Sequence, residues 1–315
     1  MRKPLLQSMI RIILLQIAAL CTLVGFSQDY IFTQKTNDLN SFNPSLVGTQ
    51  SDMGVQLNYY NQWPQLDNNP ILMSMLTNYN LKNGLGIGLA YCTELFGLTK
   101  ENKVKTNVNY ALNTGDIELK VGTSLGFNQQ SFDVNRINTP VGPDPNLTGN
   151  NTGRYFSLDI GAAAYYHGFV AGVSSYQLNK PSYKMFSSTY NVNASYNGFV
   201  GYSKKLNDLR LSGLIAFQQI SKLSSLDYHI SGQYKFVKLG LGLHSYYGAY
   251  GNTDYISASS GVIFDQFSVA YSYASDPFSR PNNLTARGTH HATVAWFFKG
   301  LKKESGLSDF VNGML

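Results

Sequence analysis

Apolar and polar side chains alternate along most of this chain. Between residues 117 and 128 the odd positions carry Ile, Leu, Val, Thr, Leu and Phe, while the even positions carry Glu, Lys, Gly, Ser, Gly and Asn. The same alternation recurs over residues 226–236, 239–244 and 267–273. A period of two predicts β-strands with one face in an apolar medium and the other in a wet or small-residue interior.

Fourteen segments follow this pattern. Most have about the 9–11 residues that a tilted transmembrane strand requires. We expect strands near residues 52–61, 71–80, 84–93, 102–111, 116–128, 154–166, 168–178, 190–203, 208–220, 225–236, 238–248, 253–264, 266–276 and 288–299.

The connections between these segments alternate between longer and shorter ones. The longer set comprises residues 62–70, 94–101, 129–153, 179–189, 221–224, 250–252 and 276–287. Long outer loops and short periplasmic turns are typical of outer-membrane barrels, and an even strand number returns both termini to the periplasm. The sequence therefore predicts an all-β protein, a transmembrane antiparallel up-and-down β-barrel of about 14 strands over residues 52–299.

Composition narrows the alternatives further. Of the 315 residues, 13% are charged and 43% are hydrophobic, the mean hydropathy is −0.16, and there are 22 Tyr, 18 Phe and 29 Gly. The hydropathy is too low for several helical spans of about 20 apolar residues, and the aromatic content is too high for a disordered chain. Charged residues are scarce because one face of every predicted strand contacts lipid, where a charge is costly.

The first 27 residues have the pattern of a secretory signal peptide. An apolar run extends from Ile12 to Phe26, and the basic residues Arg2, Lys3 and Arg11 precede it. Gly25-Phe26-Ser27 offers a cleavage site. Removal of residues 1–27 lowers the basic count from 24 to 21 against 18 acidic residues, a net charge of +3. That charge does not imply a nucleic-acid partner. The remaining chain has Cys92 as its one cysteine, so no internal disulfide is expected.

Two stretches lie outside the predicted strands. Residues 28–51 are polar and contain the turn-like Phe42-Asn43-Pro44, and they form either a periplasmic lead or a plug in the lumen. Residues 300–315 are predicted to form a periplasmic C-terminal tail with a short helix.

The sequence shows no established catalytic, cofactor or metal motif. His229 and His244 fall on predicted interior faces, where a metal site or a Ser–His hydrolase is conceivable, but no partner motif accompanies them. Two polar residues of the lumen wall are the favoured interpretation. We therefore expect no cofactor and no enzymatic activity.

Several short motifs resemble the PorP/SprF family of Bacteroidota. They are a Gln-Asp lead at residues 28–34, an Asn-Pro-Ser-x-x-Gly element at residues 43–48, and Tyr59-Tyr60-Asn61-Gln62-Trp63, followed by a glycine strand at residues 84–88 and Gly288-Thr289-His290-His291-Ala292. Two positions depart from the family pattern, because Tyr60 stands where Arg is usual and His291 where Glu is usual. The resemblance marks Asn43, Pro44, Gly48, Gln62, Trp63 and His290 as candidate partner-binding or structural residues.

The resemblance implies an outer-membrane barrel of the type IX secretion and gliding machinery. Its implied role is to bind a secreted adhesin through that adhesin's C-terminal domain, and to support its export or surface anchoring. The implied partners are the adhesin, a periplasmic peptidoglycan-binding lipoprotein with other secretion components, and outer-membrane lipid. A channel for small apolar molecules is the main alternative. A lipase or acyltransferase would require a Ser–His pair at the lipid-facing rim.

Overall fold

A computed structural model describes residues 39–81, 83–134, 151–248, 251–275, 288–298, 300 and 306–314. Within these residues, fourteen antiparallel strands close into a barrel, as the alternation predicts. The predicted signal peptide and residues 28–38 of the predicted lead or plug lie outside the described part.

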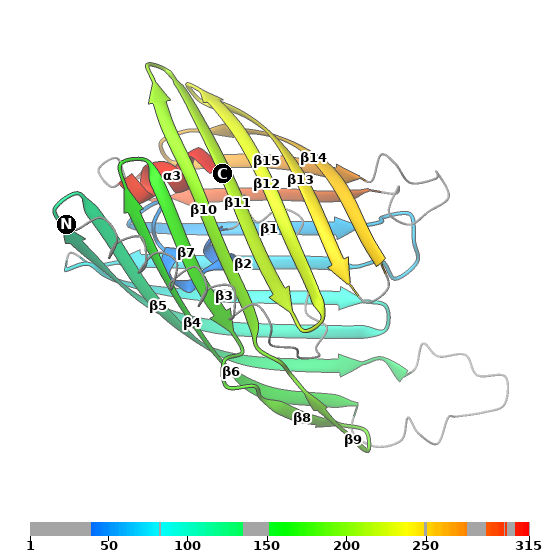
Figure 1. Cartoon of the computed structure of the whole chain (residues 1–315). Coiled ribbons are helices and arrows are strands. Elements are labelled where there is room, and N and C mark those ends of the chain that lie inside the picture. The colour runs from blue at the N-terminus through cyan, green and yellow to red at the C-terminus, as the bar shows by residue number, and fades with distance from the viewer. Residues whose placement is uncertain are drawn as a thin grey trace, which may run out of the picture.

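Each barrel strand pairs with its neighbours along the chain, and the last strand pairs with the first (Figure 1). A small separate hairpin, β8–β9, is inserted between β7 and β10. The barrel strands are β1 (Met53–Gln62), β2 (Ile71–Asn80), β3 (Leu85–Phe96), β4 (Thr99–Thr114), β5 (Ile117–Phe132), β6 (Thr152–Tyr166), β7 (Phe169–Tyr176), β10 (Ser195–Leu206), β11 (Leu209–Ile220), β12 (Leu223–Tyr234), β13 (Val237–Gly248), β14 (Gly251–Ile263), β15 (Phe267–Ser275) and β16 (Thr289–Phe297); the hairpin strands are β8 (Ser182–Met185) and β9 (Ser188–Asn191).

The barrel wall is apolar outside and polar or small inside. On β5, Leu125 is 63% exposed whereas Asn128 is fully buried, and the intervening residues alternate in the same way. A membrane barrel needs this arrangement, because its outer face contacts hydrocarbon and its closed sheet leaves no backbone group unpaired in lipid. Exposed apolar residues therefore mark the lipid-facing surface.

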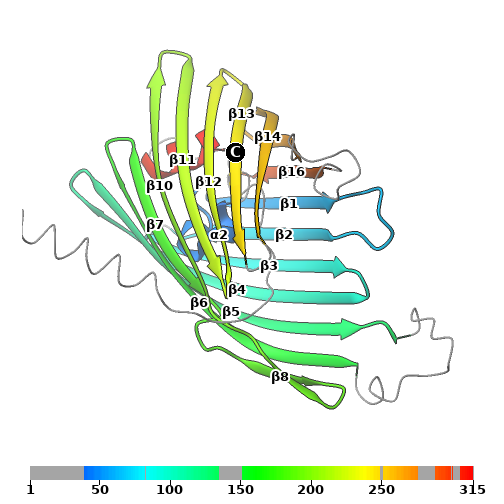
Figure 2. The same cartoon turned by 45° about the vertical axis from the view of Figure 1, so that its right-hand side comes forward.

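The connections gather at two ends of the barrel (Figure 2). One end, the short-turn end, carries the tight turns around His167-Gly168 and Asn207-Asp208, and β1 starts and β16 finishes there. The other end, the long-loop end, carries the β1–β2 and β5–β6 connections and the β8–β9 hairpin.

Three predicted segments differ from the observed structure, and one of them is residues 221–224, of which only Ser221 and Lys222 lie between β11 and β12. Residues 94–101 do not form a long loop, because β3 and β4 stay paired up to Phe96 and Thr99. Glu94 and Glu101 face the lumen, where Lys103 forms an ion pair with each of them. The predicted strand over residues 190–203 begins only at Ser195, since residues 188–191 belong to the hairpin, whose four-residue strands are too short to show a period.

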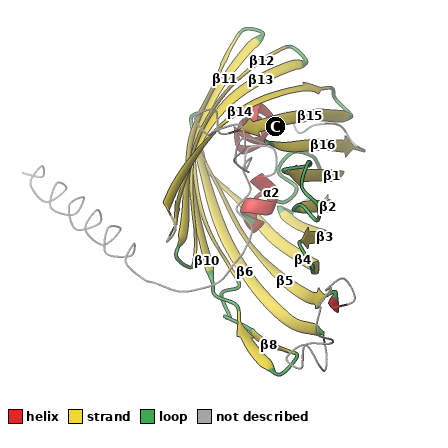
Figure 3. Ribbon diagram, turned by 90° about the vertical axis from the view of Figure 1, so that its right-hand side faces the viewer, coloured by secondary structure: helices red, strands yellow, loops and turns green. Residues whose placement is uncertain are grey.

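The lumen contains two segments of the chain itself (Figure 3). One comprises residues 41–51, which include the end of α2 (Leu39–Phe42) and the 3-10 helix η1 (Pro44–Leu46). The other is α3 (Gly306–Met314), within the stretch predicted as a periplasmic tail. Both place apolar side chains in one buried cluster with inward-facing wall residues, formed by Phe42, Leu46, Ala163, Val170, Phe199, Leu214, Ala216, Leu307, Phe310, Val311 and Met314. Among the described residues, no helix has the length and apolar character needed to cross a membrane.

Candidate functional site

Residues 41–51 are bound mainly through their backbone carbonyl groups. The wall side chains donate the hydrogen bonds: Asn107 Nδ2 to Pro44 O at 2.9 Å and Asn109 Nδ2 to Val47 O at 3.0 Å. Lys120 Nζ lies 2.9 Å from Thr49 Oγ1. Irregular backbone in a membrane-embedded lumen needs such partners, because an unpaired buried carbonyl is costly.

Asn43 reaches the wall backbone in two places. Its Nδ2 donates to the carbonyl oxygens of Ala162 and Val173, both at 3.1 Å, while its Oδ1 accepts from the backbone N–H of Ser45 at 2.9 Å. A Cβ on Gly161 would lie 2.1 Å from that Oδ1. The glycine therefore makes room for the asparagine.

Pro44 and Gly48 occupy similarly fitted positions. A Cβ on Gly122 would lie 2.6 Å from Pro44 O, so this wall glycine permits the close approach. Gly48 has φ +72°, a left-handed conformation that favours glycine, and its carbonyl accepts a hydrogen bond from Asn80 Nδ2. Asn43, Pro44 and Gly48 thus belong to a single structure in the lumen.

The other three candidate residues lie on the seam where β1 meets β16, at the long-loop end. The Trp63 N–H donates to Gly288 O at 2.9 Å, and Gln62 O accepts from Asn69 Nδ2 at 2.8 Å. His290 Nδ1 lies 2.7 Å from the Tyr271 hydroxyl on the outer face. The six candidates therefore form two separate groups.

The two departures from the family pattern are direct neighbours on this seam. Tyr60 and His291 are paired opposite one another in the β1–β16 register, both side chains are buried, and their rings meet edge to face at 6.0 Å. This chain therefore has an aromatic pair at the two positions where the resemblance would place Arg and Glu.

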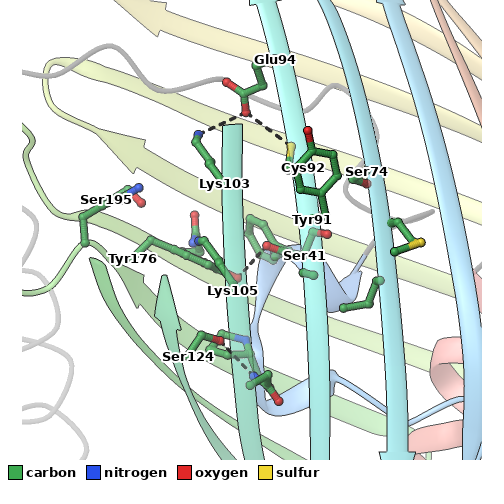
Figure 4. A pocket seen from close by; sticks show the side chains of 18 of the residues that line it. Ser41, Ser74, Tyr91, Cys92, Glu94, Lys103, Lys105, Ser124, Tyr176 and Ser195 are labelled. Carbon is green, nitrogen blue, oxygen red and sulfur yellow. Dashed lines mark hydrogen bonds and ion pairs between the residues drawn. The ribbon is translucent and has the colours of Figure 1, made fainter. Parts of the chain in front are cut away.

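A cavity of about 140 Å³ lies in the lumen on the long-loop side of residues 41–44 (Figure 4). Charged side chains of β3 and β4 line it: Lys103 contacts Glu94 and Glu101 at 3.2 Å each, and Lys105 contacts Asp159 at 2.7 Å and lies over the Tyr176 ring. Sequence reasoning missed this cavity, although charges at inward positions of the alternation are a usable signal.

His244 takes part in a buried Ser–His–Asp arrangement. Its Nδ1 lies 2.7 Å from Asp227 Oδ1, and its Nε2 lies 2.8 Å from Ser257 Oγ. These distances match a nucleophile, a base and an orienting carboxylate. All three side chains are buried on the lumen face, however, and not at the lipid-facing rim that a lipase would use.

The same strands offer this arrangement no oxyanion hole. β13, β14 and β15 are paired in continuous antiparallel register around Ser257, so their backbone N–H groups serve the sheet. Among the described residues, no group of three or more His, Cys, Asp or Glu could hold a metal. The arrangement satisfies buried polar groups in the wall.

Comparison with known proteins identifies the family. The model of the type IX secretion system membrane protein PorP/SprF matches residues 24–296. None of the curated proteins compared matches the chain in sequence.

Two solved structures are similar to this chain. A Pseudomonas aeruginosa FadL homologue is 9% identical, with 87% of this chain and 100% of that chain covered at a TM-score of 0.52. Omp33 from Acinetobacter baumannii is 9% identical, with 80% of this chain and 100% of that chain covered at a TM-score of 0.49. The first likeness supports the barrel fold, and the family match covers nearly the whole barrel. The chain belongs to the PorP/SprF family of type IX secretion system membrane proteins.

Proposed function

We propose that this barrel binds the C-terminal domain of a secreted surface adhesin at its long-loop end, and thereby supports export of the adhesin or its anchoring at the cell surface. The observation that carries the proposal is the unequal filling of the lumen. The short-turn half holds residues 41–51 and α3, whereas the long-loop half holds a cavity. A protein partner is better suited to such a lumen than a transported solute.

The β8–β9 hairpin adds a recognition surface at the same end. Tyr155, Tyr183 and Tyr190 stack in sequence, with ring centroids 5.4 and 5.3 Å apart, and Tyr190 is 40% exposed at the end of the stack. Rigid tyrosines are favoured at protein interfaces, because they bury large amphipathic area with little loss of conformational freedom.

The short-turn end suits a periplasmic role in this proposal. β1 begins and β16 finishes there, and the two lumen segments join the barrel at that end. In the outer membrane this end would face the periplasm with both termini, and would meet the peptidoglycan-binding lipoprotein and other secretion components. Residues 41–51 and α3 would then act as a plug.

Deletion of the gene tests the proposal directly. We expect the adhesin encoded nearby to be lost from the cell surface, measured by antibody labelling of intact cells. Complementation with a Tyr183→Ala/Tyr190→Ala variant should restore barrel levels but not display, whereas Ser188→Ala/Thr189→Ala on the same hairpin should restore both. Normal display in the deletion strain would contradict the proposal.

The channel alternative has its own measurement. A barrel plugged by residues 41–51 and α3 should give no steady conductance in planar bilayers, and should not cause swelling of liposomes in small solutes. Stable single-channel conductance of the purified protein would favour the channel.

A further inference from the structure

The lipid-facing surface of the barrel has a hollow of about 890 Å³ over β10–β14, which are neighbours in the wall (Figure 1). It lies on the outer face, because the large apolar side chains around it point outward in the alternation and are exposed: Tyr202, Leu211, Ile230 and Leu239. We call this feature the outer hollow. It shares no lining residue with the cavity in the lumen.

Two outward-facing glycines form the floor of the outer hollow. Gly213 lies opposite Ile230 and Gly232 opposite Leu211 in the β11–β12 register, so the glycines occupy one diagonal and the large side chains the other. Apart from its neighbours in its own strand, a Cβ on Gly213 would meet no heavy atom closer than 3.9 Å, and one on Gly232 none closer than 3.6 Å. The space above the glycines is therefore open, and no side chain of the described residues fills it.

A hollow that faces lipid is filled by hydrocarbon. Apolar groups beside a void lose dispersion contacts, and the side chains around the outer hollow are mainly apolar. Its volume falls within the range of about 300–1,000 Å³ that is typical of small-molecule sites. Acyl chains are the apolar groups that a membrane supplies, so the outer hollow fits an acyl chain.

One charged side chain, that of Lys204, lies at the rim of the outer hollow. It is exposed and points outward, opposite Leu211 in the β10–β11 register. The other outward-facing residues of β10–β13 are uncharged. Among the residues that the structure describes, Lys204 forms no ion pair, not even with Asp208 in the adjoining turn. An ammonium group on a lipid-facing wall favours an anion beside it, because a lone charge there is costly.

The position of Lys204 along β10 matches the level of a lipid headgroup. It is two residues before Leu206, where β10 finishes at the short-turn end. Two residues of a strand span about 7 Å. A lysine at this depth keeps its aliphatic stem against apolar surface and extends its ammonium group to the headgroup layer. A phosphate in that layer would lie within its reach.

We propose that the outer hollow is a binding site for an anionic phospholipid. One acyl chain lies over Gly213 and Gly232, between the side chains of Leu211 and Ile230, and the phosphate oxygens accept hydrogen bonds from Lys204 Nζ. A neutral glycerolipid fills the hollow equally well but leaves the lysine without a counterion. That the lipid comes from the periplasmic leaflet rests on the orientation given under the proposed function. The site itself does not.

Two glycine variants test the hollow in the full-length protein. Gly213→Leu fills it, whereas Gly198→Leu adds the same side chain on the same outer face of β10, where the nearest atom to a Cβ is also 3.9 Å away, but outside the hollow. Native mass spectrometry of delipidated protein titrated with dioleoylphosphatidylglycerol measures binding. We expect one saturable lipid on the wild type and on Gly198→Leu, bound about tenfold more weakly by Gly213→Leu.

The control for these variants is the barrel itself. Heat-modifiable electrophoretic mobility confirms that each variant forms a closed barrel. Equal affinity in the two variants would overturn the proposal, as would the absence of saturable binding to the wild type.

Two lysine variants test the charge. The wild type should bind dioleoylphosphatidylglycerol about fivefold more tightly than dioleoylglycerol, which has the same chains and no phosphate. Lys204→Gln should abolish this preference, whereas Lys100→Gln, at an exposed outward-facing position of β4 near the long-loop end, should keep it. A preference that survives in Lys204→Gln would overturn the assignment of the phosphate to this lysine.

Lipid A tests the source of the phosphate. It carries two phosphates and several acyl chains, more than one lysine and one hollow accommodate, so equimolar lipid A should leave bound phosphatidylglycerol in place. Displacement would overturn the assignment to a phospholipid. These measurements use purified protein, so they decide on the site whatever gene deletion does to adhesin display.

Discussion

The two halves of the lumen are built from the same strands but differ in what fills them. In the short-turn half, side chains such as Asn107, Asn109 and Lys120 find partners in residues 44–49 of the same chain. In the long-loop half, Asn197 and Gln218 keep acceptor oxygens without donors. Residues 41–51 and α3 fill the short-turn half, whereas the long-loop half keeps a cavity.

The largest expected change in stability concerns the buried apolar cluster in the short-turn half. Phe310 is buried in the cluster shared by α3 and residues 42–46. We expect Phe310→Ala to lower the free energy of unfolding by about 3–5 kcal/mol, because it leaves a cavity. Urea unfolding in detergent, followed by tryptophan fluorescence, measures the change. An effect below about 1 kcal/mol would show that α3 contributes little to the fold.

A pair of amide substitutions compares the halves directly. Asn107→Leu removes the bonds to Pro44 O and Ser124 Oγ, and should cost about 1–3 kcal/mol because Pro44 O is then left buried without that donor. Gln218→Leu removes an oxygen that has no donor, and should change stability by less than about 0.5 kcal/mol. The same unfolding assay serves both. Equal costs would erase the distinction between the halves.

The seam of the long-loop half offers a double-mutant cycle. Tyr60→Arg and His291→Glu each place one charge in a buried position, whereas the double variant pairs the two charges across the β1–β16 register. We expect the double variant to be more stable than the sum of the single effects predicts, by about 0.5–3 kcal/mol. Additive effects would mean that the two positions act independently.

The smallest expected effect on stability lies at the hairpin. Tyr190 is exposed and stacks on one ring face of Tyr183, so Tyr190→Ala should change the free energy of unfolding by less than about 0.5 kcal/mol. The same variant should nevertheless lower adhesin display if the hairpin contacts the partner. A large loss of stability would instead show that the tyrosine stack stabilises the fold.

The wall was the predictable part of the molecule. Lipid on one side and lumen on the other impose a period of two, and residues 117–128 show it because each position meets one environment only. The hairpin and the 94–101 turn were missed for a shared reason. Their residues gain partners from other strands, as Tyr183 of β8 does from Tyr155 of β6 and Glu94 of β3 from Lys103 of β4.

The candidate sites also divide into a part that the sequence predicted and a part that it did not. A short motif predicted Asn43, Pro44 and Gly48 as candidate residues, because a tightly packed segment needs particular residue types at consecutive positions. The cavity has no such motif, since Cys92 of β3, Gln177 just after β7 and Gln218 of β11 become neighbours only when the barrel closes. The sequence alone does not distinguish one inward-facing Asn or Gln from another, because their hydrogen-bond partners are set only when the barrel closes.

The cluster that joins Phe42 and Leu46 to Phe310 and Met314 has a consequence for assembly in the membrane. Phe42 and Leu46 come before the first strand and the α3 members come after the last, and they meet on wall residues of β6, β7, β10 and β11. A barrel arrested with a missing or misregistered strand would lack this core and would expose both apolar segments. The cluster thus couples burial of the two apolar segments to completion of the wall.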